Sequence, residues 1–118
     1  MTQLIACLTT GKGSWSEVSR IIDGADWEKV FLITNEFGKE KFNKKSNTEL
    51  LVLNLEKPVA ELSNDIEKVL KPKLSGLEVG LNLSSGTGSE HMAILSALIR
   101  CGVGFRIILS ENNSLKEI

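Results

Sequence analysis

The segment Leu8-Thr9-Thr10-Gly11-Lys12-Gly13-Ser14-Trp15-Ser16-Glu17 joins an apolar run to a helical pattern. A second segment of the same kind, Asn82-Leu83-Ser84-Ser85-Gly86-Thr87-Gly88-Ser89-Glu90, follows later in the chain. Both contain the Ser/Thr-x-x-Glu pattern, Ser14 with Glu17 and Thr87 with Glu90, which predicts a capping box at a helix start. The chain therefore has two glycine-rich turns, each leading from a strand into a helix.

Outside these turns, short apolar runs alternate with amphipathic stretches. The apolar runs predict strands over residues 3–8, 29–34, 49–55, 77–83 and 104–109. The stretches between them predict helices over residues 14–23, 36–42, 58–70 and 87–100. The polar tail from Ser110 onward is expected to fray.

Strands that are apolar throughout and separated by helices are typical of a parallel sheet covered on both faces. We therefore predict one α/β domain over residues 1–118, a Rossmann-like three-layer sandwich with a mostly parallel five-stranded sheet. The expected strand order is 3-2-1-4-5, which opens a ligand crevice between strands one and four, at the two glycine-rich turns. The alternative order, 2-1-3-4-5, would separate the turns.

The composition indicates an ordinary soluble globular protein, with 118 residues, 42% of them hydrophobic and 25% charged. The net charge of −1 does not point to a duplex DNA partner, which usually selects a basic face. No apolar run approaches the ~20 residues of a membrane span, and the N-terminal residues carry no basic signal-peptide region, so we expect a cytoplasmic protein. Cys7 and Cys101 lie among apolar residues, which predicts buried, reduced thiols.

Both turns have the chemistry of an anion site. Glycine lets the backbone approach a ligand closely, and the helix start beyond it offers N–H groups and a partial positive charge. Two such turns in one small domain favour a ligand with more than one phosphate. The alternatives are a tight turn with ordinary caps for the first segment, and a turn that needs small residues for packing for the second.

The first turn matches neither common phosphate-binding motif. Lys12 lies between two glycines, unlike the lysine of a Walker motif, and Ser16 stands where the dinucleotide fingerprint requires a third glycine. The second turn carries four hydroxyl groups that could bond phosphate or ribose, and Asn82 would either read a base edge or brace the turn. Thr34-Asn35-Glu36, at the end of the second strand, offers an acidic ribose ligand.

A family resemblance rests on these motifs. Asn82-x-Ser84-Ser85-Gly86-Thr87-Gly88, the Glu90-His91-Met92-Ala93 that follows and the Gly102-Val103-Gly104 run resemble the CARF family, the Rossmann-like sensor domains of CRISPR-associated proteins. The turn Thr9-Thr10-Gly11 fits the same family, and the resemblance covers nearly the whole chain in strand order. It implies a homodimer that binds a cyclic oligoadenylate, the second messenger of type III CRISPR antiviral signalling, across the dimer axis.

The chain departs from the family pattern at two points. CARF domains are mostly fused to an effector, but none follows the last strand here. Three alternatives are open: a bare sensor that acts through a separate effector protein, a fragment of a longer protein, or a standalone protein whose output is binding or cleavage. Gly88 stands where many members have a lysine or arginine, and Lys12 is the cation that could substitute. The resemblance implies that the ligand-binding residues are Thr9, Thr10, Gly11, Lys12, Gly13, Thr34, Asn35, Asn82, Ser84, Ser85, Gly86, Thr87, Gly88 and Ser89. No metal and no cofactor are expected.

Two alternative functions stay open. Some CARF proteins are ring nucleases, which cleave the cyclic ligand without a metal; here Lys12, Ser14 or the hydroxyl groups of the second turn would stabilise the developing charge. The other alternative is a general nucleotide-binding Rossmann-like protein.

Several further side chains have both a structural and a functional interpretation. His91 is either a hydrogen-bonded structural residue or a ligand contact, and Trp15 is either a packing residue or an adenine stacker. The lysines at 39, 41, 44 and 45 form either a solvated loop or a lid. The helix predicted over residues 87–100 is apolar on more than one face, which favours a subunit interface.

Overall fold

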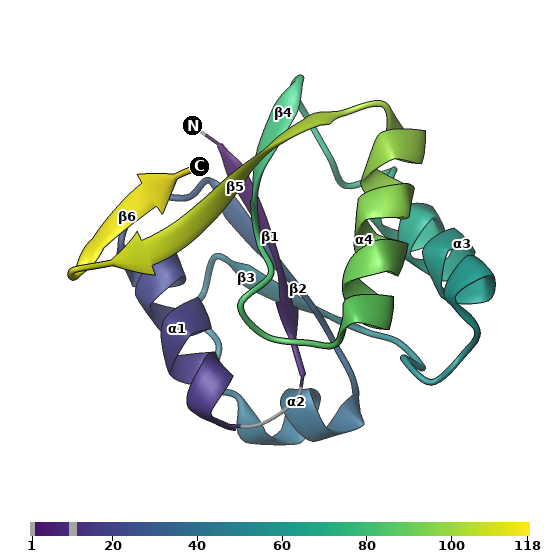
Figure 1. Ribbon diagram of the computed structural model, residues 1–118, viewed down its shortest axis with the longest axis horizontal. Helices are drawn as coiled ribbons and strands as arrows, with labels where there is room; N and C mark the ends of the chain where they lie inside the picture. Colours follow the sequence, from purple (N-terminus) through teal and green to yellow (C-terminus); the bar gives the residue numbers. More distant parts are fainter. Residues whose placement is uncertain (1, 10–11) are drawn as a thin grey trace.

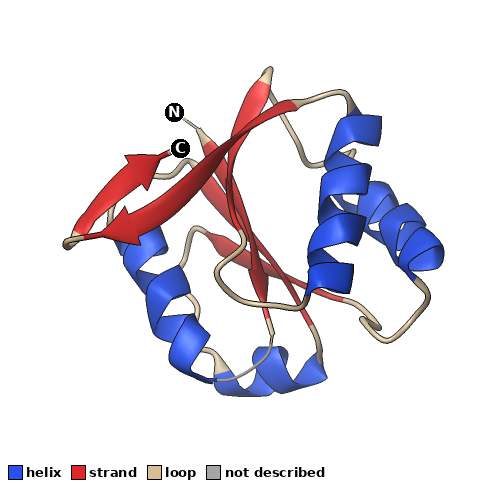
Figure 2. Cartoon of the chain, viewed as in Figure 1, coloured by secondary structure: helices blue, strands red, loops and turns tan. Residues whose placement is uncertain are grey.

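A twisted six-stranded sheet separates two layers of helices in the computed structural model, which describes residues 2–9 and 12–118 (Figures 1 and 2). The strands are β1 (Gln3–Leu8), β2 (Lys29–Thr34), β3 (Thr48–Val52), β4 (Glu78–Asn82), β5 (Gly104–Glu111) and β6 (Ser114–Glu117). The helices are α1 (Lys12–Asp23), α2 (Glu36–Lys41), α3 (Val59–Leu70) and α4 (Gly88–Cys101).

The strand order is β3-β2-β1-β4-β5-β6, which confirms the predicted 3-2-1-4-5 arrangement and adds one strand. All neighbouring strands from β3 to β5 are parallel. The winding reverses between β1 and β4, whose register pairs Leu4 with Gly80 and Ala6 with Asn82. The two glycine-rich turns therefore leave the same edge of the sheet from adjacent strands.

Alternating side chains of the central strands form two cores. In β1, Ile5 and Cys7 face α3 and α4, and this larger core includes Leu62, Ile66, Ile94 and Leu98 from the two helices. Leu4, Ala6 and Leu8 face α1, where they meet Trp15, Val18, Ile21 and Ile22. Because β1 and β2 are buried on both faces, they appear in the sequence as continuous apolar runs.

The prediction of a fraying tail and of only five strands was wrong. β6 pairs antiparallel with β5, so that Glu111 lies opposite Ser114. Asn112 and Asn113 have φ values of 52° and 62°, the left-handed pair that a two-residue type I′ hairpin needs. Leu115 then packs against the α1 core, and this contact anchors the tail.

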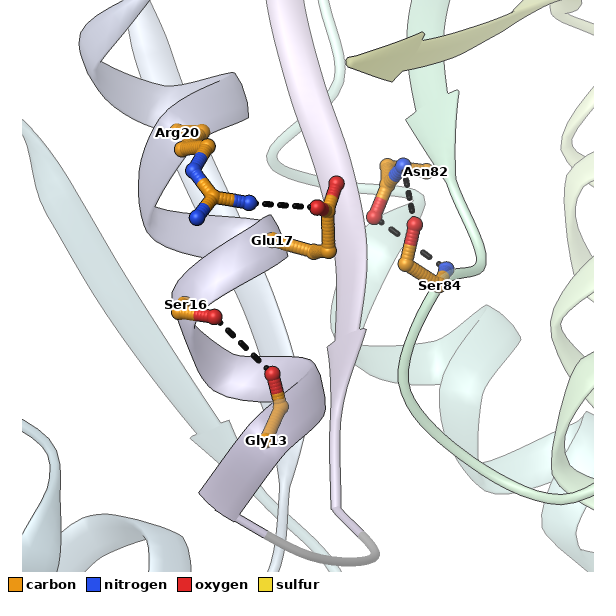
Figure 3. Close-up of polar contacts among 6 residues, drawn as sticks. All are labelled: Gly13, Ser16, Glu17, Arg20, Asn82 and Ser84. Carbon is orange, nitrogen blue, oxygen red and sulfur yellow. Dashed lines mark hydrogen bonds and ion pairs between the residues drawn. The ribbon is translucent and has the colours of Figure 1, made fainter. Parts of the chain in front are cut away.

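The two predicted capping boxes have different outcomes. Thr87 caps α4, and Thr87 and Glu90 make both reciprocal hydrogen bonds of the box. The box at Ser14 was wrong, because α1 already includes Lys12 and Gly13, which makes Ser14 a helical residue. Glu17 pairs instead with Arg20 on the next turn (Figure 3). None of the helices in the described part of the chain has the length and apolar character needed to cross a bilayer.

Candidate ligand site at the β1 and β4 turns

Ser85 joins the two glycine-rich turns. Its buried hydroxyl accepts a hydrogen bond from the Thr9 backbone N–H (2.9 Å) and donates one to the Thr9 carbonyl (2.9 Å). Ser14 Oγ, from the first turn of α1, donates to the same hydroxyl (2.9 Å). These hydrogen bonds connect the loop before α4 to the end of β1. The strand order confirms that both turns follow adjacent strands, as predicted, whereas the bonds between them were not predicted.

Glu90 forms a second link between the turns. Its carboxylate accepts hydrogen bonds from the Thr9 hydroxyl (2.6 Å) and from the Thr87 backbone N–H (3.0 Å). The Cys7 thiol lies 3.8 Å from the same oxygen. Burial, reinforced by the negative charge of Glu90, raises the pKa of Cys7 to about 12. Cys7 is thus a protonated core residue, as expected for a reduced buried thiol.

Position 86 requires glycine because of its backbone conformation and the side chains packed against it. Its φ of +110° favours glycine, and a Cβ atom there would lie 2.7 Å from Cys7 Sγ and 2.9 Å from His91 Nε2. His91 Nε2 is hydrogen bonded to the Ser85 carbonyl oxygen (2.8 Å), which matches the structural interpretation of this histidine. A side chain at position 86 would therefore disturb the protein itself before it met a ligand.

Asn82 braces the turn, the second of its two predicted roles. Its side-chain nitrogen donates to Ser84 Oγ (3.0 Å) and its oxygen accepts from the Ser84 N–H (3.2 Å) (Figure 3). The same nitrogen also donates to the Ile108 carbonyl (2.7 Å). Thr34 is likewise buried and donates to the Leu8 carbonyl (2.6 Å). Asn35 caps α2 by accepting from the Gly38 N–H (3.0 Å).

The predicted site residues thus divide into two groups. Thr9, Thr34, Asn82 and Ser85 are buried and hold the loops in place through the bonds described above. Gly13, Ser84, Thr87, Gly88 and Ser89 are exposed, with Ser14, Asn35 and Gly86 half-buried. Thr10, Gly11 and the side chain of Lys12 lie outside the described part of the structure. The exposed group lies around the starts of α1 and α4.

A groove of about 640 Å³ extends from these turns toward β3. Thr9 and Asn35, which the sequence predicted as ligand contacts, line it together with Glu36, but the sequence did not indicate the contribution of the connection after β3. Thr9 and Glu90 line the groove on the side of β1 and α4, and the connections after β2 and β3 form the rest. Phe37, in α2, lines it with half of its surface exposed. Trp15 does not reach it; this buried side chain packs against Phe37 and Phe42, which agrees with its interpretation as a packing residue.

Of the four lysines predicted to form a solvated loop or a lid, two make polar contacts within the protein. Lys44 Nζ donates to the Thr48 carbonyl (3.3 Å), and Lys45 pairs with Asp23 at the end of α1. Lys39 and Lys41 are exposed on α2. Within residues 2–9 and 12–118, no three His, Cys, Asp or Glu side chains are placed to hold a metal ion together.

The fold and this crevice define a Rossmann-like α/β domain whose candidate site lies where the winding of the sheet reverses. No family model matches the chain, and no curated relative is found for it. The CARF resemblance therefore rests on the sequence motifs.

Proposed function

We propose that this chain is a CARF-type domain that binds a cyclic oligoadenylate between two copies, as a sensor in type III CRISPR antiviral signalling. The observation that carries the proposal is the link between the two motif-bearing turns. Ser85 and Glu90 bind Thr9, which joins both turns at the crevice between β1 and β4. A ring ligand with several phosphates needs more than one anion-binding segment within reach.

The start of α4 supplies the chemistry for phosphate. Thr87 and Glu90 bond each other's backbone N–H groups, which leaves the N–H groups of Gly88 and Ser89 at the exposed helix start. These groups combine hydrogen-bond donors with the positive end of a 14-residue helix. The Glu90 carboxylate accepts hydrogen bonds from Thr9 and Thr87, so the phosphate is assigned to the N–H groups of Gly88 and Ser89 beside it.

The same helix supports the dimer. Met92 and Ile99 lie two turns apart on α4 and are 60% and 68% exposed, whereas Ile94 and Leu98 face the core. Exposed apolar side chains on one stripe are typical of an interaction surface. A second copy docked on this stripe would bring two α4 helices to one ring.

Calorimetric titration with cyclic tri-, tetra- and hexa-adenylate tests the proposal. We expect one of these rings to bind with one ring per two chains, and to bind more tightly than linear oligoadenylate, ATP or NAD. Equal binding of linear nucleotides by a monomer would instead favour a general nucleotide-binding protein. Analysis of the ligand after titration shows whether linear product forms, which is the ring-nuclease alternative.

A matched pair of variants locates the site. Ser89→Glu places a carboxylate in the first turn of α4, where it favours the helix but repels phosphate, so we expect binding to weaken at least ~10-fold with no loss of stability. Ser75→Glu makes the same change at an exposed serine that precedes β4, at the amino-terminal end of that strand and so at the opposite end from the glycine-rich turns. Equal affinities for these two variants would contradict a site at α4.

A second pair tests the dimer. Ile99→Lys puts a charge on the exposed stripe of α4, and Ile118→Lys makes the same substitution beside the β5–β6 hairpin, where Ile118 is 72% exposed. Light scattering should report a monomer for Ile99→Lys and a dimer for the wild-type chain and Ile118→Lys. A dimeric Ile99→Lys would move the interface away from α4.

A further inference from the structure

The groove beside the glycine-rich turns has the lining of a nucleobase site. It is formed at the carboxyl ends of three adjacent strands, by Thr9 after β1, by α2 after β2, and by the β3–α3 connection. Two of its lining residues, Thr9 and Glu90, belong to the turns of the candidate phosphate site. A ligand whose phosphates lie at the turns could therefore extend a base into the groove.

Phe37 provides a flat apolar surface at a fixed position. Its ring is half-exposed in the groove while packing against Trp15, with ring centroids 5.7 Å apart and planes tilted by 54°. Trp15 is itself anchored, because its indole N–H donates to the Thr9 carbonyl (2.8 Å). An aromatic ring that is already held in place loses little entropy when a base stacks on it.

The polar lining excludes phosphate and favours hydrogen-bond donors. Glu36, Glu56 and Glu90 line the groove, whereas no lysine or arginine is among its described lining residues. Glu90 is engaged by Thr9 and Thr87, but Glu36 and Glu56 are exposed and make no side-chain hydrogen bond within the described chain. Carboxylates accept hydrogen bonds and repel anions, so they select an uncharged ring that carries an amino group.

We infer that this groove binds an adenine base, with Phe37 stacked on the ring and Glu36 or Glu56 accepting a hydrogen bond from the exocyclic amino group. The inference rests on the proposed function, because it assigns the groove to one base of the oligoadenylate. It adds the determinant of base identity, which the phosphate-binding turns do not provide. Hypoxanthine presents a carbonyl oxygen in place of the amino group and would face the carboxylates unfavourably.

Titration with nucleosides followed by amide NMR tests the groove without any phosphate. Adenosine at millimolar concentration should shift the amides of Phe37 and residues 52–56, and inosine should bind several-fold more weakly. Phe37→Leu should weaken adenosine binding by about 10-fold, within the usual range for loss of base–aromatic stacking. Phe42→Leu is the matched control, since Phe42 also packs on Trp15 but does not line this groove. It should bind adenosine like the wild type.

Two further results would overturn the inference: equal affinity for adenosine and inosine, or a Glu36→Gln/Glu56→Gln double variant that keeps the wild-type preference. Absence of groove shifts with adenosine, or wild-type binding by Phe37→Leu, would also overturn it. Circular dichroism of each variant verifies the fold. If a cyclic oligoadenylate binds while adenosine leaves the groove unperturbed, only this inference fails. If adenosine binds in the groove and no cyclic ligand binds, the proposed function fails instead.

Discussion

Ser85→Ala should destabilise the protein by far more than an ordinary buried serine substitution. The Ser85 hydroxyl makes three hydrogen bonds, two to the Thr9 backbone and one to Ser14, and all of them join the second turn to the first. After the substitution the Thr9 carbonyl still accepts from the Trp15 indole, but the buried Thr9 N–H loses the Ser85 oxygen.

The magnitude follows from these partners. A buried donor without an acceptor costs about 1–3 kcal/mol, and each satisfied hydrogen bond contributes about 1 kcal/mol. We therefore expect Ser85→Ala to lower the free energy of unfolding by about 3 kcal/mol. Ser63→Ala is the matched control, because Ser63 is also buried but makes one side-chain bond, to Ser96 Oγ (2.9 Å). Its expected loss is about 1 kcal/mol.

Urea denaturation of both variants and the wild-type chain measures the difference. A gap of about 2 kcal/mol between the variants, with unchanged slopes, supports the link between the turns. Equal destabilisation of the two variants would refute the reasoning, because the Thr9 backbone would then have found other partners at no cost.

Three further predictions concern single side chains. Between pH 8 and pH 10 the wild type should lose about 1 kcal/mol more stability than Cys7→Ala, because the unfolded thiol ionises near its ordinary pKa of 9.0 while burial holds the folded pKa near 12. Stability is thus retained below pH 9 and falls as pH rises; if urea melts show that both proteins lose the same free energy of unfolding between pH 8 and pH 10, the prediction is contradicted. Leu115→Ala should lower the free energy of unfolding by about 1–2 kcal/mol, since this half-buried side chain packs on the α1 core, whereas a frayed tail would give no change. Gly88→Lys should strengthen binding of cyclic oligoadenylate a few-fold in calorimetry, because a Cβ atom there meets no atom within 4 Å and the lysine adds a cation beside the helix start; unchanged affinity would place the phosphates elsewhere.

The parallel sheet could be predicted because each of its strands is marked in the sequence. β1 and β2 were predicted with their observed bounds, since burial on both faces makes a strand an unbroken apolar run between polar turns. The meeting of the two turns followed from strand order alone. The capping box at Thr87 was also predicted, because its two side chains are neighbours in sequence as well as in space.

The features that were missed depend on contacts between distant segments or on a short local signal. β6 is an edge strand with one apolar anchor, Leu115, so its composition resembles a loop, and only the Asn112-Asn113 pair marked the hairpin. The sequence predicted Ser14 as a helix cap, but α1 begins earlier. The Ser14 hydroxyl instead donates a hydrogen bond to Ser85, 71 positions away in the sequence. Phe37 lines the groove only because the ends of three strands converge there.

Amide NMR during titration with a cyclic oligoadenylate tests the central claim most directly, since it reports both binding and its location. The account predicts that the amides of Ser84, Gly88 and Ser89 shift together with those of Gly13 and Ser14, and that the shifts saturate at one ring per two chains. Absence of shifts with the tri-, tetra- and hexa-adenylate rings at high micromolar concentration would contradict it. So would shifts confined to residues away from the starts of α1 and α4.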